Sequence, residues 1–170
     1  MGIAHLLVGE PRSGKTTALK HIIDVIGAIR CGGFYTEELC AVGERYGFNV
    51  VTLDGRTGVL ADVAYNYPLR VGKYGVTLQA LESIGIASIY EALASKQFIV
   101  IDEIGPMQLL SEKFKLAVME ALEGSVPILG TVFSGSNPWL DELKRQRKVK
   151  LYPLTSDNRD VLPQILVETL

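Results

Sequence analysis

The hydrophobic positions of the chain follow two alternating patterns. Short, mostly apolar runs cover residues 3–8, 98–101 and 126–133, and polar or turn-forming residues bound each run. Runs of this length and composition are typical of strands that are buried on both faces. Between them, apolar residues recur at intervals of three and four, as they do along one face of a helix. Strands that alternate with helices predict an α/β fold with a mostly parallel central sheet and helices on both faces.

The helical pattern is clearest over residues 111–123, where five apolar residues share one face. Asn137 and Pro138 suit the N-cap and the first residue of a shorter helix. Gly85 weakens the start of another helical stretch. We expect a last strand over residues 149–154 and helices over residues 16–29, 83–95, 111–123, 138–147 and 158–170.

A stretch without helical periodicity follows the first predicted helix. Residues 32–36 form a run that is entered through glycines, and residues 46–53 and 59–64 are rich in residues that favour strands. Asp54-Gly55, between the last two runs, is a strong hairpin signal. We therefore expect an antiparallel β insertion after the first strand–helix unit, from residue 33 to about residue 76.

The bulk composition agrees with one small enzyme-like domain over residues 1–170. The chain is 48% hydrophobic, and its net charge is −2 with a pI of about 5.7. This balance gives no reason to expect a nucleic-acid or membrane partner. The cysteines, Cys31 and Cys40, do not have zinc-site spacing, and we expect reduced thiols. Because no signal peptide precedes the first strand, we expect a cytoplasmic protein, and its oligomeric state stays open.

One segment matches a phosphate-binding motif at every fixed position. Residues 9–16 read GEPRSGKT, which fits the P-loop pattern G-x-x-x-x-G-K-[ST]. The segment lies between a predicted strand and a predicted helix, where backbone N–H groups and the helix N-terminus bind polyphosphates. We expect Lys15 to reach the β- and γ-phosphates and the Thr16 hydroxyl to bind Mg²⁺. The residues expected to bind nucleotide here are Gly9, Glu10, Pro11, Arg12, Ser13, Gly14, Lys15, Thr16 and Thr17.

A second candidate lies where Asp102 and Glu103 follow the apolar run 98–101. We expect this strand to lie beside the phosphate-loop strand, which would bring Asp102 near Thr16 as another Mg²⁺ ligand and nucleotide-binding residue. Glu103 would then face the γ-phosphate, where a carboxylate can orient or deprotonate an attacking water. Lys15 and Glu103 are therefore the expected catalytic residues. The alternative for Glu103 is a solvated loop acid.

Six stretches in the same order resemble one family of proteins. They are residues 9–17, 33–37, 46–48, 71–76, 101–107 and 158–160. In them the chain resembles the THEP-type nucleoside-triphosphatases, relatives of the cancer-related nucleoside-triphosphatase. The resemblance implies a P-loop NTPase fold and hydrolysis of ATP, GTP and other nucleoside triphosphates with Mg²⁺ and loose base choice. Gln108 departs from the family pattern, which usually has Glu after the methionine at 107.

Several other polar residues have two interpretations each. Lys73 and Tyr74 lie between glycines, in a segment that would either cover the nucleotide or form an ordinary loop. Asn158 would either hold the base or cap the last helix. The basic run 144–150 is typical of a solvated face near a helix C-terminus. Three arginines are either surface residues or candidates to stabilise developing charge, namely Arg56, Arg70 and Arg159.

The residues leave three functions open. The first is hydrolysis of nucleoside triphosphates to diphosphate and phosphate. The second is a nucleotide or small-molecule kinase with the same loop, although a kinase usually has an arginine-bearing lid, and no arginine-rich insertion stands between residues 121 and 158. The third is a slow switch, against which Glu103 argues. No N-K-x-D element precedes the last predicted helix, so we expect ATP, GTP, CTP and UTP all to be substrates.

Overall fold

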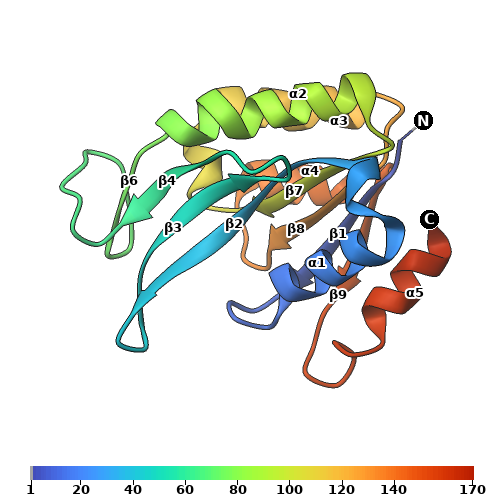
Figure 1. Cartoon of the computed structure of the whole chain (residues 1–170), viewed down its shortest axis with the longest axis horizontal. Helices are drawn as coiled ribbons and strands as arrows, with labels where there is room; N and C mark the ends of the chain where they lie inside the picture. The colour runs from blue at the N-terminus through green and yellow to red at the C-terminus, as the bar shows by residue number, and fades with distance from the viewer. Residues whose placement is uncertain (1) are drawn as a thin grey trace.

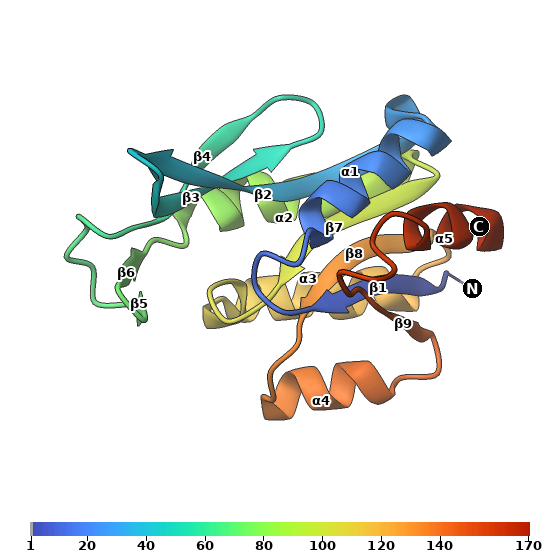
Figure 2. The ribbon, with the colours of Figure 1, turned by 90° about the horizontal axis from the view of Figure 1, so that it is seen from below.

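The structure, a computed structural model, describes residues 2–170, and all of its strands join one mixed sheet. The strands are β1 (Ala4–Gly9), β2 (Cys31–Ala41), β3 (Glu44–Thr52), β4 (Thr57–Asp62), β5 (Arg70–Val71), β6 (Tyr74–Val76), β7 (Phe98–Ile104), β8 (Ile128–Phe133) and β9 (Val149–Pro153). Their order across the sheet is β5-β6-β4-β3-β2-β7-β8-β1-β9 (Figures 1 and 2). The predicted α/β class with a mostly parallel central sheet is confirmed.

The sheet has a parallel part and an antiparallel part that meet in β2. Strands β2, β7, β8, β1 and β9 pair in parallel. Strand β2 pairs with β7 through residues 31–34 and continues as an antiparallel partner of β3 through residues 34–41. The antiparallel insertion expected from the sequence is therefore present, and its first strand also belongs to the parallel part.

Helices cover both faces of the parallel part (Figures 1 and 2). The helices are α1 (Lys15–Ile26), α2 (Ile86–Ser95), α3 (Glu112–Glu123), α4 (Pro138–Arg145) and α5 (Leu162–Thr169). Three short helical turns are η1 (Ala28–Arg30), η2 (Leu81–Gly85) and η3 (Gln108–Leu110). None of the helices described is long and apolar enough to cross a membrane.

Alternation along the central strands explains why both faces are buried. In β1, Leu6 points into the core with α2, α3 and α4, and Leu7 points into the core with α1 and α5. In β7, Ile99 and Val100 divide in the same way. Successive strand residues face opposite sides, so a continuous apolar run suits a strand between two helical layers. This is the pattern from which the strands were predicted.

The predicted position of β7 is wrong. The strand that ends in Asp102 does not pair with β1, because β8 lies between them and pairs with both. Gly130 in the middle of β8 makes the close fit possible, since a Cβ there would overlap the carbonyl oxygen of Ile101 and approach Leu6 to 3.2 Å. A local motif does not contain this strand order, which depends on a strand far along the chain.

Three predicted helix boundaries also differ. The first helix ends at Ile26, since Gly27 has a φ of 100° and only the turn η1 follows. The second helical stretch begins earlier than expected, with the π-helical turn η2 running directly into α2. The last helix begins at Leu162 rather than 158. There, the Asn158 side chain accepts from the Thr155 backbone N–H at 2.7 Å and donates to the Pro153 carbonyl at 2.8 Å, which stabilises a turn instead.

Candidate functional site

A cleft of about 490 Å³ opens at the carboxyl ends of β1 and β7. Ligands of α/β sheets bind in this position. Polar and charged side chains meet apolar ones around the cleft. Its lining consists of Pro11, Arg12, Gly14, Lys15, Thr16, Thr17, Lys20, Thr36, Glu37, Glu38, Arg45, Phe48, Val71, Asp102, Glu103, Pro106, Met107, Gln108 and Phe133.

The loop between β1 and α1 has the features of an anion site. Gly14 has a φ of 95° and no side chain to cap α1, so the first N–H groups of the helix are available to a ligand. The hydroxyl of Ser13 is buried and has no hydrogen-bond partner within residues 2–170. A Cβ on Gly9 would lie 2.6 Å from that hydroxyl, so this position requires glycine. A buried, unpaired donor beside free N–H groups suits a phosphate.

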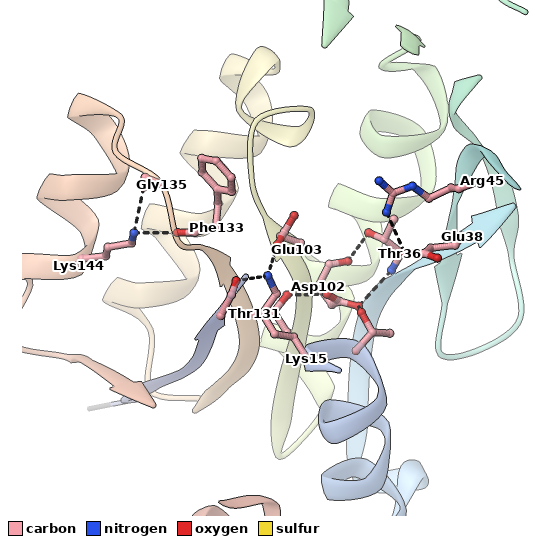
Figure 3. Close-up of polar contacts among 12 residues, drawn as sticks. Lys15, Thr36, Glu38, Arg45, Asp102, Glu103, Thr131, Phe133, Gly135 and Lys144 are labelled. Atoms are coloured by element: carbon pink, nitrogen blue, oxygen red, sulfur yellow. Dashed lines mark hydrogen bonds and ion pairs between the residues drawn. The ribbon is translucent and has the colours of Figure 1, made fainter. Parts of the chain in front are cut away.

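Lys15 lies between this loop and the end of β7. Its Nζ donates to the Gly9 carbonyl at 2.7 Å and lies 3.3 Å from Oε2 of Glu103 (Figure 3). Gly105 leaves room for the Glu103 carboxylate, because a Cβ at Gly105 would come within 2.6 Å of Oε1. The ion pair therefore occupies the space beside the loop where a triphosphate would end.

Asp102 is 2% exposed and connects four elements. Its carboxylate accepts hydrogen bonds from the hydroxyl of Thr16 at 2.8 Å, from the hydroxyl of Thr131 and from the backbone N–H of Thr36 at 3.4 Å. The Thr36 hydroxyl donates to the Asp102 carbonyl at 2.6 Å. Burial raises the pKa of Asp102 to about 6, and the charge of Glu103 adds to the effect, although the threonine hydrogen bonds oppose it.

The donor set at Thr16 and Asp102 fits Mg²⁺. A hydroxyl and a carboxylate in direct contact supply the oxygen ligands that this ion prefers, and it usually takes its other ligands from phosphates and water. Residues 2–170 contain no group of three or more His, Cys, Asp or Glu placed to hold a metal. A P-loop Mg²⁺ site does not need such a group.

The structure brings most of the predicted phosphate-loop, metal and catalytic-base residues together in the cleft, but Glu10 is exposed and does not line it, and other candidates are also separated from it. Arg56 pairs with Glu91 at 2.6 Å outside the cleft, and Arg70 binds backbone carbonyls of its own loop. Arg159 does not line the cleft. Of the glycine-flanked pair, neither Lys73 nor Tyr74 lines it, and Tyr74 packs in the core.

Sequence reasoning missed several residues of the site. Thr131 stands in an otherwise apolar buried strand, and a polar residue in such a run is the signal that would have identified it. Lys144 belongs to the basic run expected to be solvated. Instead, its Nζ donates to the carbonyls of Phe133 at 2.7 Å and Gly135 at 3.3 Å and holds the loop after β8 (Figure 3). Arg45 lines the cleft from β3, and no local pattern distinguishes it from a surface arginine.

A glycine-bounded loop that joins a strand to a helix, with a buried carboxylate held against its threonine, defines a P-loop nucleotide-binding protein. The family model described as NTPase matches residues 4–167. The nucleoside-triphosphatase THEP1 of Thermotoga petrophila is 41% identical over 157 residues, which cover 92% of this chain and 87% of that protein. The chain belongs to this family of nucleoside-triphosphatases and is an enzyme of that class.

Two solved structures of the family have the same fold. The crystal structure of THEP1 from the hyperthermophile Aquifex aeolicus matches with a TM-score of 0.88 at 33% identity, over 100% of this chain and 99% of that one. The solution structure of a human cancer-related nucleoside triphosphatase matches with a TM-score of 0.84 at 34% identity, over 99% and 97% of the two chains. The family resemblance seen in the sequence is therefore confirmed.

Proposed function

We propose that the protein hydrolyses ATP, GTP, CTP and UTP to the diphosphate and phosphate and that the reaction depends on Mg²⁺. The observation that carries this proposal is the meeting of Lys15, Thr16, Asp102 and Glu103 in one cleft, although 86 residues separate Thr16 from Asp102. Phosphoryl transfer needs little covalent chemistry from a protein, so the positions and charges of these groups are what matters.

The loop residues 9–17 bind the phosphates in this proposal. Backbone N–H groups of the loop and of the first turn of α1 donate to phosphate oxygens, and Lys15 neutralises charge between the β- and γ-phosphates. Thr16 and Asp102 would hold Mg²⁺, which would supply positive charge against the negative charge that develops during phosphoryl transfer. The Thr131 hydroxyl and the Thr36 backbone N–H donate to the Asp102 carboxylate and keep it in place for that role.

Because of the Lys15–Glu103 ion pair, the action of Glu103 as catalytic base depends on the presence of substrate. An arriving triphosphate offers Lys15 a more highly charged partner, so Lys15 turns to the phosphates and the Glu103 carboxylate is released. Glu103 then accepts a proton from a water whose oxygen attacks the γ-phosphorus. The bond between that phosphorus and the β,γ-bridging oxygen breaks, and the nucleoside diphosphate leaves with the electron pair.

Broad base tolerance is supported by the loop before α5. Asn158, the residue there best suited to read a base, uses its side chain on the backbone of residues 153 and 155. A site without hydrogen bonds to a base edge discriminates weakly between bases. We therefore expect specificity constants for the four nucleotides within about two orders of magnitude of one another.

The test is phosphate release from each of the four nucleotides, with Mg²⁺ and with excess chelator, for the native protein and Lys15→Ala. We expect release from all four, loss of release with chelator, and a fall of at least about a hundredfold in Lys15→Ala, because a preorganised charge at the phosphates is removed. Lys113→Ala, which removes an exposed lysine of α3 that does not line the cleft, is the control for loss of a lysine. Normal turnover by a folded Lys15→Ala protein would overturn the assignment of the loop.

A further inference from the structure

The lining of the cleft extends from the phosphate loop to residues of β2, β3 and β5. The γ-phosphate end of a bound nucleotide points to Asp102 and Glu103, because the metal ligand and the base act there. The sugar and the nucleobase of the bound nucleotide then extend in the opposite direction, toward β9 on the other side of β1. The loop after β9 lies directly there, since Leu154 donates its backbone N–H to Val8 at 2.7 Å.

The cleft continues on the γ-phosphate side, away from β9. Beyond Asp102 and Glu103 it is bounded by β2, β3, β5 and the loop that follows β7. We call this part the distal chamber. Its walls are Glu38, Arg45, Phe48, Val71, Met107 and Gln108. None of the residues that line the cleft comes from the segment 154–161, so the cleft itself does not extend to the loop that follows β9.

The apolar walls of the chamber suit a flat body. Phe48 is half-buried with its ring edge-to-face against Tyr74 at 5.3 Å, and Val71 and Met107 are half-buried as well. An aromatic ring, a thioether and a branched side chain around one space favour a planar, weakly polar molecule.

The polar groups of the chamber together offer hydrogen-bond donors and acceptors side by side. Arg45 donates through Nη1 to Glu38 at 3.0 Å (Figure 3). It also donates through Nε to the Tyr74 hydroxyl at 3.0 Å, and its guanidinium lies 5.0 Å from the Phe48 ring centre. These bonds use two of the five guanidinium N–H donors. Gln108 is 3% exposed, yet it lines the cleft, and its amide carries both functions. The opposite charges of Arg45 and Glu38 balance, so the chamber suits a neutral ligand with donors and acceptors on one edge.

We propose that the distal chamber binds a phosphoryl acceptor, a neutral hydroxyl compound of the nucleoside type, and that the enzyme transfers the γ-phosphoryl group to it. The proposal rests on the proposed function, because the phosphate loop, Mg²⁺ ligands and Glu103 are the same. The acceptor hydroxyl takes the place of water beside Glu103. Its oxygen forms a bond to the γ-phosphorus, the bond to the β,γ-bridging oxygen breaks, the nucleoside diphosphate leaves with the electron pair, and Glu103 receives the hydroxyl proton.

The first test follows the fate of labelled γ-phosphate from ATP with Mg²⁺ and increasing adenosine, guanosine, cytidine or uridine. We expect label to move from free phosphate into nucleoside monophosphate as at least one nucleoside increases. If label moves to an added nucleoside, but no phosphate is released when nucleoside is left out, the result would support the chamber and overturn hydrolysis as the function. Normal phosphate release with no transfer to any nucleoside would overturn the chamber and leave the proposed function standing. Absence of both would overturn both.

The second test asks whether acceptor and nucleotide bind together. A nucleoside that is phosphorylated in the first test is titrated into protein saturated with a non-hydrolysable ATP analogue and Mg²⁺, and binding is followed by calorimetry. We expect binding as tight as, or tighter than, binding to the free protein. Displacement of the analogue by the nucleoside would place it in the nucleotide site and overturn the proposal.

Variants separate the chamber from the phosphate loop. Phe48→Ala should raise the KM for the nucleoside by about tenfold to a hundredfold through lost stacking, with a much smaller effect on the KM for ATP. Because Phe48 also packs against the core, Gln108→Leu, which keeps the volume and removes the amide, is the second variant and should act in the same direction. Tyr90→Ala, which removes an exposed aromatic ring on α2, is the matched control. Equal effects of all three variants on both KM values would contradict the proposal.

Discussion

Asp102 is enclosed on every side by groups from other elements, and its charge is therefore costly in the free protein. Burial raises its pKa to about 6, although Thr16 and Thr131 donate hydrogen bonds to it. A cation placed against the carboxylate would remove that cost. The residue proposed to bind Mg²⁺ is thus one that the free protein destabilises, as is common at functional sites.

This leads to a prediction about pH. The carboxyl of Asp102 has a pKa of about 6 when folded and 3.8 when unfolded. The folded protein therefore binds the proton more tightly, and the Asp102 contribution to stability is present in full below pH 3.8 and is lost as the pH rises through about 6. The Asp102→Asn side chain does not titrate in this pH range, so its contribution to stability does not change with pH. In urea unfolding without nucleotide or Mg²⁺, the stability of Asp102→Asn relative to the native protein should decline as the pH falls from 7 to 4.5, by at most about 1.4 kcal/mol per pH unit. A constant difference would mean that Asp102 is ionised throughout.

Asp102 and Glu103 are adjacent, yet their substitution should have different effects. Asp102→Asn should weaken nucleotide binding with Mg²⁺ and have little effect on binding with chelator, because only the metal contact is lost. Glu103→Gln should retain binding with Mg²⁺ and lower turnover by about a hundredfold or more, as expected for a lost base. Binding is measured with a fluorescent nucleotide analogue and turnover by phosphate release. Normal turnover by Glu103→Gln would mean that the base lies elsewhere.

The sequence predicted the part of the site that a short motif contains. The P-loop pattern identified Lys15 and Thr16, and an apolar run ending in two acids identified Asp102 and Glu103. Arg45 was missed because it becomes part of the cleft only when β3 folds back along β2, through pairs such as Glu38 with Phe48. Its significance depends on tertiary neighbours, which no spacing along the chain reveals.

At the scale of elements, helices α3 and α4 begin beside side-chain caps, whereas helix α5 has no such cap and begins later than predicted. Ser111 accepts the backbone N–H of Phe114 at 3.1 Å before α3, and Asn137 caps α4 just before Pro138. Helix α5 has no side-chain cap, and Asn158, which was considered as one, stabilises the preceding turn. Residues such as Asn suit both caps and turns, so the sequence alone does not distinguish them.

The cap of α4 gives a measurable prediction. Asn137 accepts the backbone N–H groups of Trp139 at 2.9 Å and Leu140 at 3.2 Å. Asn137→Ala leaves these donors unpaired and should lower the free energy of unfolding by about 1 kcal/mol. Asn66→Ala, in an exposed loop, is the control and should change it by less than about 0.5 kcal/mol. Equal values for the two variants in urea unfolding would show that the cap contributes nothing.

At the scale of the whole molecule, β2 joins the two parts of the sheet, and Gly33 is its most constrained residue. Gly33 has a φ of 114°, and a Cβ there would overlap the backbone of Val100 in β7. The alternation of strands and helices predicted the parallel part of the sheet, and the strand-favouring runs around Asp54-Gly55 predicted the antiparallel part. The order of strands was not predictable, because it depends on such close approaches between distant segments.

The contact at Gly33 can be separated from backbone strain. Gly33→Ala and Gly55→Ala both place a side chain at a positive φ, 114° and 96°, but Gly55 has no atom within 4 Å of the added Cβ. Gly55→Ala should cost about 1 kcal/mol from strain alone. Gly33→Ala should cost at least about 2 kcal/mol more, because β2 must move away from β7. Urea unfolding measures both. Similar losses would show that the strands separate easily.

The pairing of β1 has a consequence for the order in which the chain gains its activity. Synthesis delivers the phosphate loop, residues 9–17, long before both neighbours of β1, since the strands β8 and β9 come from residues 128–153. Contacts between such distant segments form late, because long loops of chain must close first. A nascent or truncated chain that ends before Ile128 therefore carries the whole motif without the strands that hold it. Retention on immobilised ATP would then report that the chain has been completed and folded, not merely that the motif has been made.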